Sequence, residues 1–234
     1  RSKITQRIYY LLHIYNPTQF NNEYDFSSYP KTIDDDISKL EEIGCNLLFL
    51  PSTKDIYPKG LEKKKIVNNF RDILCDKFRP GHFDGVTTVV DLFFNIIKPT
   101  NSYFGEKDFQ QVKIIQELAK INNHNINIIQ CPSIRDISGM SLSSRNSKFS
   151  NDELKIFKIL GDKVNEYIYL LKQNEINNLD QLKKELLQNN INKIDYLEIR
   201  DENNLQITKN YSEARLFIAL YIGDIRIIDN FKLY

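Results

Sequence analysis

RPGHFDGVTTVV at Arg79–Val90 is followed by YFGEKDFQQ at Tyr103–Gln111 and by SGMSLSSRN at Ser138–Asn146. Around these segments, short apolar runs that stop at a proline or a turn alternate with amphipathic stretches of helical spacing. The expected strands are Ile8–Tyr15, Asn46–Leu50, Ser102–Phe104 and Ile126–Cys131, and the expected helices are Thr32–Ile43, Gly85–Lys98 and Asp108–Asn122. This alternation predicts an α/β fold with a parallel sheet and crossover helices.

The pattern changes after the third segment. Ser150 and Glu153 form a capping box, which predicts a long helix that runs to about Gln173. The other elements expected in this half are a helix over Leu179–Gln188 and strands over Ile194–Arg200, Ala214–Tyr221 and Ile225–Ile228. Helices followed by successive strands predict a smaller α+β domain over residues 138–234, after a first domain over residues 1–137.

Composition excludes several classes of partner. The 234 residues carry a net charge of +1, which gives no electrostatic reason to expect a nucleic acid. No apolar run approaches the length of a membrane span, so no membrane partner is expected. The three cysteines, Cys45, Cys75 and Cys131, form neither a zinc pattern nor a disulfide framework, which indicates a reduced, cytoplasmic protein.

The GEKD turn, Gly105–Asp108, lies between a predicted strand and a predicted helix. In an α/β sheet this is the carboxyl edge, where ligands bind. The helix start offers free amides to a phosphate, and Lys107 adds a positive charge beside them. One turn further on, Gln110 and Gln111 carry amides that suit a small hydroxy acid. The alternative is a turn with an exposed lysine and exposed glutamines.

Two other loops carry polar groups. Asn16 and Gln19 directly follow the first predicted strand, so Gln19 is expected to face the same crevice as Gln111. The loop that contains Ser143, Ser144 and Arg145 offers two hydroxyls and a guanidinium to phosphate oxygens. Each pattern is also compatible with an ordinary turn, because Asn-Pro and Ser-Ser-Arg are common.

The histidines and acidic residues suggest no hydrolase and no metal-ligand cluster. His82, in the RPGHF loop, is able to orient a carboxylate or an amine, whereas His13 is expected in the core and His124 on the surface. Asp34–Asp36 lie in a first helical turn, where the helix dipole favours negative charge. The same run is also able to assist Mg²⁺ that is held mainly by phosphates.

The motifs in order resemble the pantothenate synthetase family of ATP-dependent ligases. The matching segments are NPTQF, YPKT, PSTKDIYPKG, RPGHF, YFGEKDFQQ, LSSRN and RLFIALYIGDIRIIDN. The resemblance implies a Rossmann-like domain of the nucleotidyltransferase type and a smaller C-terminal lid domain. It also implies a cytoplasmic homodimer that condenses pantoate with β-alanine through pantoyl adenylate, with ATP as substrate and Mg²⁺ held mainly by ATP.

The resemblance also implies roles for individual residues. Gln19 and Gln111 would bind pantoate, and Gln19 would also lie near β-alanine. Lys107 and Arg145 would stabilise the reacting phosphates. The expected ATP-binding residues are Gly105, Glu106, Lys107, Asp108, Ile134, Leu142, Ser143, Ser144 and Arg145. Asn16, Arg79 and His82 would line the substrate pocket.

Some departures from the family pattern leave other interpretations open. The chain begins at Arg1 and contains no His-x-Gly-His, so we expect that a first strand and helix are missing. Cys75-Asp76 stands where the family usually has Glu-Gly. One alternative is a related nucleotidyltransferase that uses another carboxylate. Another is a non-catalytic binding protein derived from the enzyme.

Overall fold

A computed structural model describes residues 10–12, 33–58, 60, 64–173, 175 and 178–234 of the chain. The helices are α2 (Ile33–Glu42), α3 (Thr53–Ile56), α4 (Leu74–Phe78), α5 (His82–Ile97), α6 (Phe109–Ile121), α7 (Asn151–Lys172) and α8 (Leu179–Gln188). The strands are β1 (Tyr10–Leu12), β2 (Leu47–Phe49), β3 (Asn101–Gly105), β4 (Asn127–Cys131), β5 (Lys193–Asp201), β6 (Ala214–Ile222) and β7 (Ile225–Lys232). Two short 3-10 helices are η2 (Glu106–Asp108) and η3 (Ser144–Lys148).

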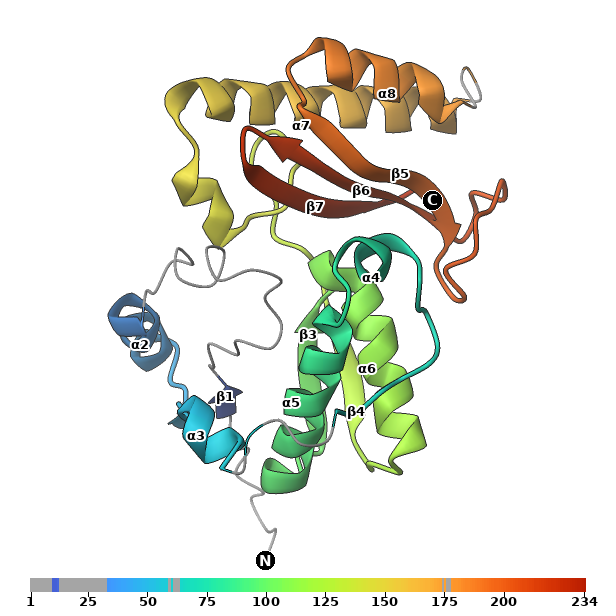
Figure 1. Cartoon of the computed structure of the whole chain (residues 1–234). Helices are drawn as coiled ribbons and strands as arrows, with labels where there is room; N and C mark the ends of the chain where they lie inside the picture. Colours follow the sequence, from blue (N-terminus) through green and yellow to red (C-terminus); the bar gives the residue numbers. More distant parts are fainter. Residues whose placement is uncertain (1–9, 13–32, 59, 61–63, 174, 176–177) are drawn as a thin grey trace, which may run out of the picture.

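The N-terminal half is an α/β structure with parallel strands (Figure 1). β1 pairs with β2, and β3 pairs with β4, both in parallel. Helix α6 packs against α5, β3 and β4. The predicted alternation of strand and helix is therefore confirmed. The parallel strands that the structure describes form two separate two-stranded sheets, where the sequence predicted one.

The C-terminal half is an antiparallel sheet of order β5-β6-β7, with α7 and α8 on one side and the N-terminal half on the other (Figure 1). Its central strand, β6, reads ARLFIALYI and is apolar on both faces. Because side chains alternate along a strand, Leu216 and Ile218 join the core cluster with α7 and α8. Phe217 and Ala219 join the cluster that contains residues of α5 and α6. The sheet therefore closes both cores, and an α+β C-terminal half is confirmed; its limits at residues 137 and 138 stay a prediction.

Local sequence signals explain where the helices begin. Ser150 and Glu153 form the predicted capping box of α7, with both hydrogen bonds present. Helix α5 begins at His82, three residues earlier than the expected Gly85, because Gly81 takes φ 77° and ends the preceding turn. The predicted N-cap of α2, Thr32, lies outside the described residues.

His124 is not the surface residue that the sequence predicted. Its Nε2 lies 2.8 Å from Oδ1 of Asp91, a buried carboxylate on α5. Asn122 donates to the same oxygen at 2.6 Å, and Lys65 Nζ lies 3.4 Å from Oδ2. Burial raises the pKa of Asp91, but these partners outweigh burial and hold the pKa below 3.8. Asp91 therefore ties the end of α6 to α5 as an anion.

Replacing Asp91 by Asn is expected to lower the free energy of unfolding by about 2 kcal/mol at neutral pH. Because the folded pKa is lowered, the charged form contributes fully above about pH 3.8, and this contribution is lost as pH falls through the folded pKa. Urea unfolding of the wild type and of Asp91→Asn at about pH 7 and about pH 3 measures this effect. The difference between their unfolding free energies should be smaller at the lower pH.

Asp152→Asn is the control, since Asp152 pairs with Lys155 on the surface, where both side chains are largely exposed. If the unfolding free energy of Asp91→Asn differs from that of the wild type by the same amount down to about pH 3, the assigned lowering of the Asp91 pKa is wrong.

Candidate active site

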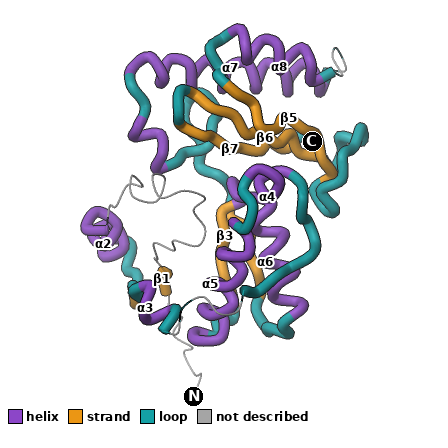
Figure 2. Tube along the Cα trace, in the orientation of Figure 1, coloured by secondary structure: helices purple, strands orange, loops and turns teal. Residues whose placement is uncertain are grey.

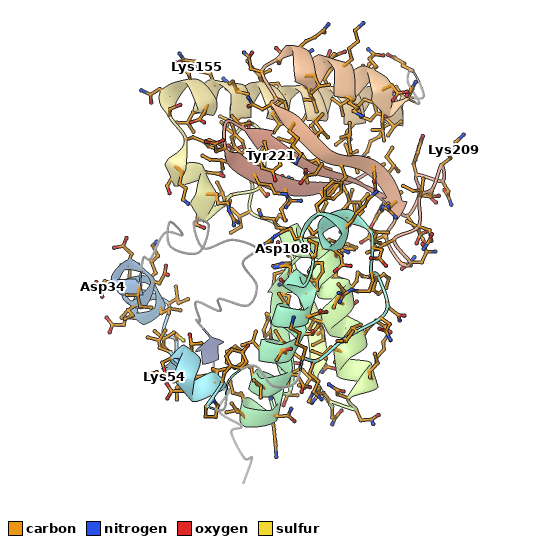
Figure 3. All side chains as sticks on the ribbon, in the orientation of Figure 1. Asp34, Lys54, Asp108, Lys155, Lys209 and Tyr221 are labelled. Carbon is orange, nitrogen blue, oxygen red and sulfur yellow. The ribbon has the colours of Figure 1, made fainter. Side chains whose placement is uncertain are left out.

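The GEKD turn lies at the carboxyl end of β3, as predicted. β3 ends at Gly105, η2 follows over Glu106–Asp108, and α6 begins at Phe109. This connection lies at the junction with the C-terminal sheet (Figure 2), and Asp108 is labelled there in Figure 3. The Glu106 side chain forms an ion pair with Arg215 of β6, with Oε2 and Nη2 2.8 Å apart. The turn is therefore fixed by the other half of the molecule.

A pocket that is open to solvent lies beside this turn. It is lined by five of the predicted site residues, namely Arg79, His82, Lys107, Asp108 and Gln111. Arg79 Nη1 lies 3.2 Å from His82 Nε2, so the two residues of the RPGHF loop contact each other. The pocket thus combines two cationic side chains, an imidazole and the Gln111 amide with the carboxylates of Asp108 and Asp229. The cations and the amide are groups that bind a small anionic hydroxy acid.

The two adjacent glutamines have different environments. Gln110 is buried, and its Oε1 accepts a hydrogen bond from the Cys75 backbone N–H at 2.9 Å. Its Nε2 donates to the carbonyls of Phe70 and Ile73 at 2.8 and 3.0 Å. Both glutamines line the pocket, but the Gln110 amide is engaged in holding the segment before the RPGHF loop, whereas the Gln111 side chain has no hydrogen bond among the described residues.

The expected ATP-binding residues outside the GEKD turn, Ile134 and Leu142–Arg145, belong to a second nucleotide segment between β4 and α7. Its first part, from Ile134 to Leu142, forms a compact loop. The Leu142 N–H donates to the Ile134 carbonyl at 2.9 Å, which brings these two predicted residues together. Asp136 Oδ1 accepts hydrogen bonds from Ser138 and from the Met140 N–H inside the loop. Ile134 and Leu142 are 74% and 52% exposed, so both are accessible to a ligand.

The Ser-Ser-Arg residues follow this loop directly. Ser143 caps η3, and its Oγ accepts a hydrogen bond from the Arg145 N–H at 3.2 Å. Ser144 begins η3 and is exposed, whereas Arg145 is half-buried. None of these three residues lines the pocket described above. The structure therefore places the two predicted nucleotide segments at neighbouring but distinct positions.

Asp229 and Asn230 of β7 contact both segments, and neither was assigned a role from the sequence. Asn230 Nδ2 donates to the carbonyls of Glu106 and Lys107 at 2.8 and 3.0 Å. Asp229 Oδ2 accepts from the Ser141 N–H at 2.7 Å. The available signal was the polar pair Asp-Asn between Ile228 and Phe231 of the strand IRIIDNFK, because buried polar side chains need partners.

A thiol and a phenol lie at the inner wall of the pocket. Cys75 Sγ is 3.1 Å from the Tyr196 hydroxyl and 3.8 Å from Nη1 of Arg226. Nε of Arg226 donates to Asp195 Oδ2 at 2.8 Å. Burial raises the pKa of Tyr196, and the adjacent Cys75 raises it further. Burial lowers the pKa of Arg226, but Cys75, Tyr196 and Asp195 outweigh burial and raise it. At neutral pH this wall therefore presents a neutral phenol backed by a cation.

Some predictions fall elsewhere. Asn16, Gln19 and His13 lie outside the described residues. Asp34–Asp36 occupy the first turn of α2, as predicted, and Asp34 lies well away from Asp108 in Figure 3.

The part of the chain that the structure describes contains no group of three His, Cys, Asp or Glu side chains able to hold a metal ion. It also contains no helix with the length and apolar character of a membrane span.

Comparison with known sequences gives consistent matches. The family model described as pantoate-beta-alanine ligase matches residues 7–232. A pantothenate synthetase of Clostridium botulinum (strain Loch Maree / Type A3) is 39% identical over 221 residues, which is 92% of this chain and 78% of the relative. A pantothenate synthetase of Caldicellulosiruptor saccharolyticus is 37% identical over 220 residues, with the same two coverages.

Solved structures give the same match. The crystal structure of pantoate-beta-alanine ligase from Francisella tularensis, complexed with beta-gamma ATP and beta-alanine, is 36% identical with a TM-score of 0.84. The matched region covers 98% of this chain and 80% of the Francisella tularensis chain. Pantothenate synthetase from Thermus thermophilus is 28% identical with a TM-score of 0.89. This match covers 97% of this chain and 84% of the Thermus thermophilus chain.

Proposed function

Because this chain belongs to the pantoate–β-alanine ligase family, we propose that it condenses pantoate with β-alanine in a reaction that consumes ATP. The named relatives are pantothenate synthetases, which are ligases. The observation on this chain that carries the proposal is the pocket in which Lys107, Gln111 and His82 meet at the carboxyl end of β3. A carboxylate and a phosphate fit that set of donors.

The first step is adenylation of pantoate. A pantoate carboxylate oxygen attacks the α-phosphorus of ATP, the bond to the pyrophosphate oxygen breaks, and pyrophosphate leaves. Lys107 lies on the GEKD turn beside the amides that open α6, so its ammonium group would stabilise the charge that develops on the phosphates. Arg145 would take the same role from the Ser-Ser-Arg segment, next to the hydroxyls of Ser143 and Ser144.

The second step is attack of the β-alanine amine on the acyl carbon of pantoyl adenylate. The C–O bond to AMP breaks, AMP leaves, and the nitrogen loses a proton as the amide forms. Neither step needs a protein nucleophile, so positioning and charge stabilisation would supply the catalysis. Gln111 would hydrogen-bond pantoate, and Arg79 with His82 would line the substrate side of the pocket. Asn16 and Gln19 keep their predicted substrate roles as proposals.

The other ATP contacts remain proposals of the same kind. The Glu106 carboxylate is already paired with Arg215, so its contribution would come from the backbone, as would those of Gly105, Ile134 and Leu142. Asp108 and Asp229 are carboxylates that line the pocket, and Asp229 is buried. Mg²⁺ would therefore be held mainly by ATP phosphates and water, with Asp108 as the accessible protein oxygen donor.

The likeness to the family is also the basis for proposing a cytoplasmic homodimer. The described cysteines Cys45, Cys75 and Cys131 are all free thiols, which is compatible with a reducing compartment. Light scattering on the purified chain tests the homodimer, and a monomeric mass at working concentration would refute it.

Pantoate-dependent ATP–pyrophosphate exchange tests the function, and Gln111 gives its sharpest variant. Gln111→Ala is expected to raise the KM for pantoate about tenfold or more, because one or two hydrogen bonds to substrate are lost. The melting temperature should stay near the wild-type value, because the side chain lines the pocket and has no hydrogen bond among those the structure describes. Pantothenate formation after addition of β-alanine completes the assay.

Gln110→Ala is the matched control on the preceding residue. Its three side-chain hydrogen bonds, one buried and two partly buried, hold the segment before the RPGHF loop, so we expect a loss of about 2–3 kcal/mol in unfolding free energy. An unchanged KM for pantoate in Gln111→Ala would contradict the assigned substrate contact. Exchange that depends on another acid instead of pantoate would replace the proposed substrate.

A further inference from the structure

Asn230 uses its whole side chain to hold the GEKD turn. The Asn230 amide nitrogen donates to two successive carbonyls, those of Glu106 and Lys107. Its Oδ1 accepts from Nη1 of Arg215 at 2.6 Å. Asn230 is 1% exposed, so water does not replace these bonds easily. The backbone from which the Lys107 side chain projects is therefore fixed by a residue of the C-terminal sheet.

The preceding residue holds the other predicted nucleotide segment. The Asp229 side chain is fully buried, and its Oδ2 accepts from the Ser141 N–H at 2.7 Å and from Nη1 of Arg135 at 3.0 Å. Arg135 Nη2 also donates to the Asn230 carbonyl at 2.7 Å. These bonds attach the loop that joins Ile134 to Leu142 to the same strand.

The two attachments leave little freedom between the segments. Asp229 and Asn230 are adjacent on β7, and Asn230 N–H donates to Asp229 Oδ1 at 2.8 Å. Strand β7 packs against both η2, which carries Lys107, and η3, which carries Arg145. A shift of one segment relative to the other would thus break buried hydrogen bonds of one dipeptide. Such rigid support is what fixed phosphate contacts require.

We propose that Asp229 and Asn230 are positioning residues, which hold the GEKD turn and the loop between Ile134 and Leu142 in one geometry for ATP. The proposal rests on the proposed function, because it assigns the purpose of that geometry to nucleotide binding. Neither residue needs to touch the reacting atoms. Asn230 acts through the backbone of Lys107, and Asp229 acts through Ser141 and Arg135.

Asn230→Asp in the full chain is the test variant. It keeps an oxygen for Arg215, so a charged partner remains and the protein is expected to fold. It replaces the donating NH₂ by an oxygen that faces two carbonyl oxygens. ATP affinity measured by calorimetry should fall about tenfold or more. In the exchange assay kcat should fall, while the KM for pantoate should change by less than about twofold.

Asn192→Asp is the matched control, because Asn192 Oδ1 accepts from Gly223 N–H and an Asp oxygen preserves that bond. A double variant separates positioning from general destabilisation. If Asn230 acts through Lys107, Asn230→Asp should weaken ATP binding by less than about twofold in a Lys107→Met background. The same tenfold loss in both backgrounds would overturn the proposal.

Hydrogen exchange on the unliganded chain gives a readout that does not depend on the proposed function. Peptides that span residues 105–111 should exchange faster in Asn230→Asp, and peptides that span residues 134–142 should exchange faster in Arg135→Ala. Arg135 is partly exposed, so this second variant perturbs the core less. Unchanged exchange in both would overturn the holding role. A wild-type chain without ATP binding would instead overturn the proposed function, leaving the exchange data to decide the holding role.

Discussion

Replacing Lys107 by Met is expected to reduce pantoate-dependent ATP–pyrophosphate exchange by about 100- to 1,000-fold. Lys107 lies in η2, directly before the first turn of α6. If that turn binds the phosphates as proposed, the Lys107 ammonium group would stabilise the charge that develops as pyrophosphate leaves. Met keeps most of the length of the side chain, so its packing against the pocket wall is retained and only the charge is lost. The melting temperature should change little, because Lys107 is half-buried and no ion pair of its side chain occurs among the described residues.

Lys120→Met controls for the loss of one positive charge. Lys120 lies near the end of the same helix, α6, where its side chain is 72% exposed and pairs with Glu117. It should leave exchange within about twofold of wild type. Exchange by Lys107→Met at the wild-type rate would show that the phosphates bind elsewhere. Arg145→Met would then be the variant to examine, because its guanidinium is the other cation assigned to the phosphates.

Elements whose determinants are local could be predicted from the sequence. The capping box at Ser150 and Glu153 places the start of α7, because both partners lie within one turn. Leu179–Gln188 was predicted with the bounds that α8 has. The GEKD turn was placed correctly because a strand, a turn and a helix follow one another directly. Gln111, which follows the GEKD turn, was expected at the same ligand crevice, and it lines the pocket in the structure.

Contacts between distant segments could not be predicted in this way. Asn230 lies 124 residues from Glu106, and Asp229 lies 88 residues from Ser141. No periodicity relates such pairs, since they depend on how the C-terminal sheet docks on the N-terminal half. His124 was misplaced because its partner Asp91 lies on α5, 33 residues earlier in the chain, and this contact depends on how α5 and α6 pack together.

Adjacent residues were also hard to separate. The sequence treats Gln110 and Gln111 alike, but neighbouring positions on a helix differ by about 100° in direction. Both line the pocket, but the amide of Gln110 is engaged by the carbonyls of Phe70 and Ile73, which belong to a distant segment of the chain. The substrate contacts of Asn16 and Gln19 remain predictions.

Arg215→Met is expected to lower the free energy of unfolding by about 3–5 kcal/mol. Arg215 Nη2 lies 2.8 Å from Glu106 Oε2 and 3.0 Å from Glu202 Oε1, and its side chain is 2% exposed. The guanidinium also lies over the Phe109 ring, 4.2 Å from its centroid. Met fills similar space but leaves both carboxylates without their cation. Urea unfolding at neutral pH measures the loss.

The loss should depend on pH through Glu202. Burial raises the pKa of Glu202, but its hydrogen bonds with Tyr234 and Arg215 outweigh burial and lower the pKa below 4.5. The stabilising charge on Glu202 is therefore present above about pH 4.5 and is lost as pH falls through the pKa that Glu202 has in the folded protein. The difference between Arg215→Met and wild type should accordingly narrow below about pH 4.5.

Arg200→Met separates stability from ligand geometry. Arg200 lies opposite Arg215 in the β5–β6 register, is also buried, and bonds Glu198 and the Leu205 carbonyl. Both variants remove a buried guanidinium from the same sheet, so both should lower the free energy of unfolding. Only Arg215 contacts Glu106 and Asn230, so Arg215→Met alone should also weaken ATP binding. Equal ATP affinities in the two variants would show that the GEKD turn keeps its geometry without Arg215, and Asn230 would then have to hold it through its two backbone hydrogen bonds.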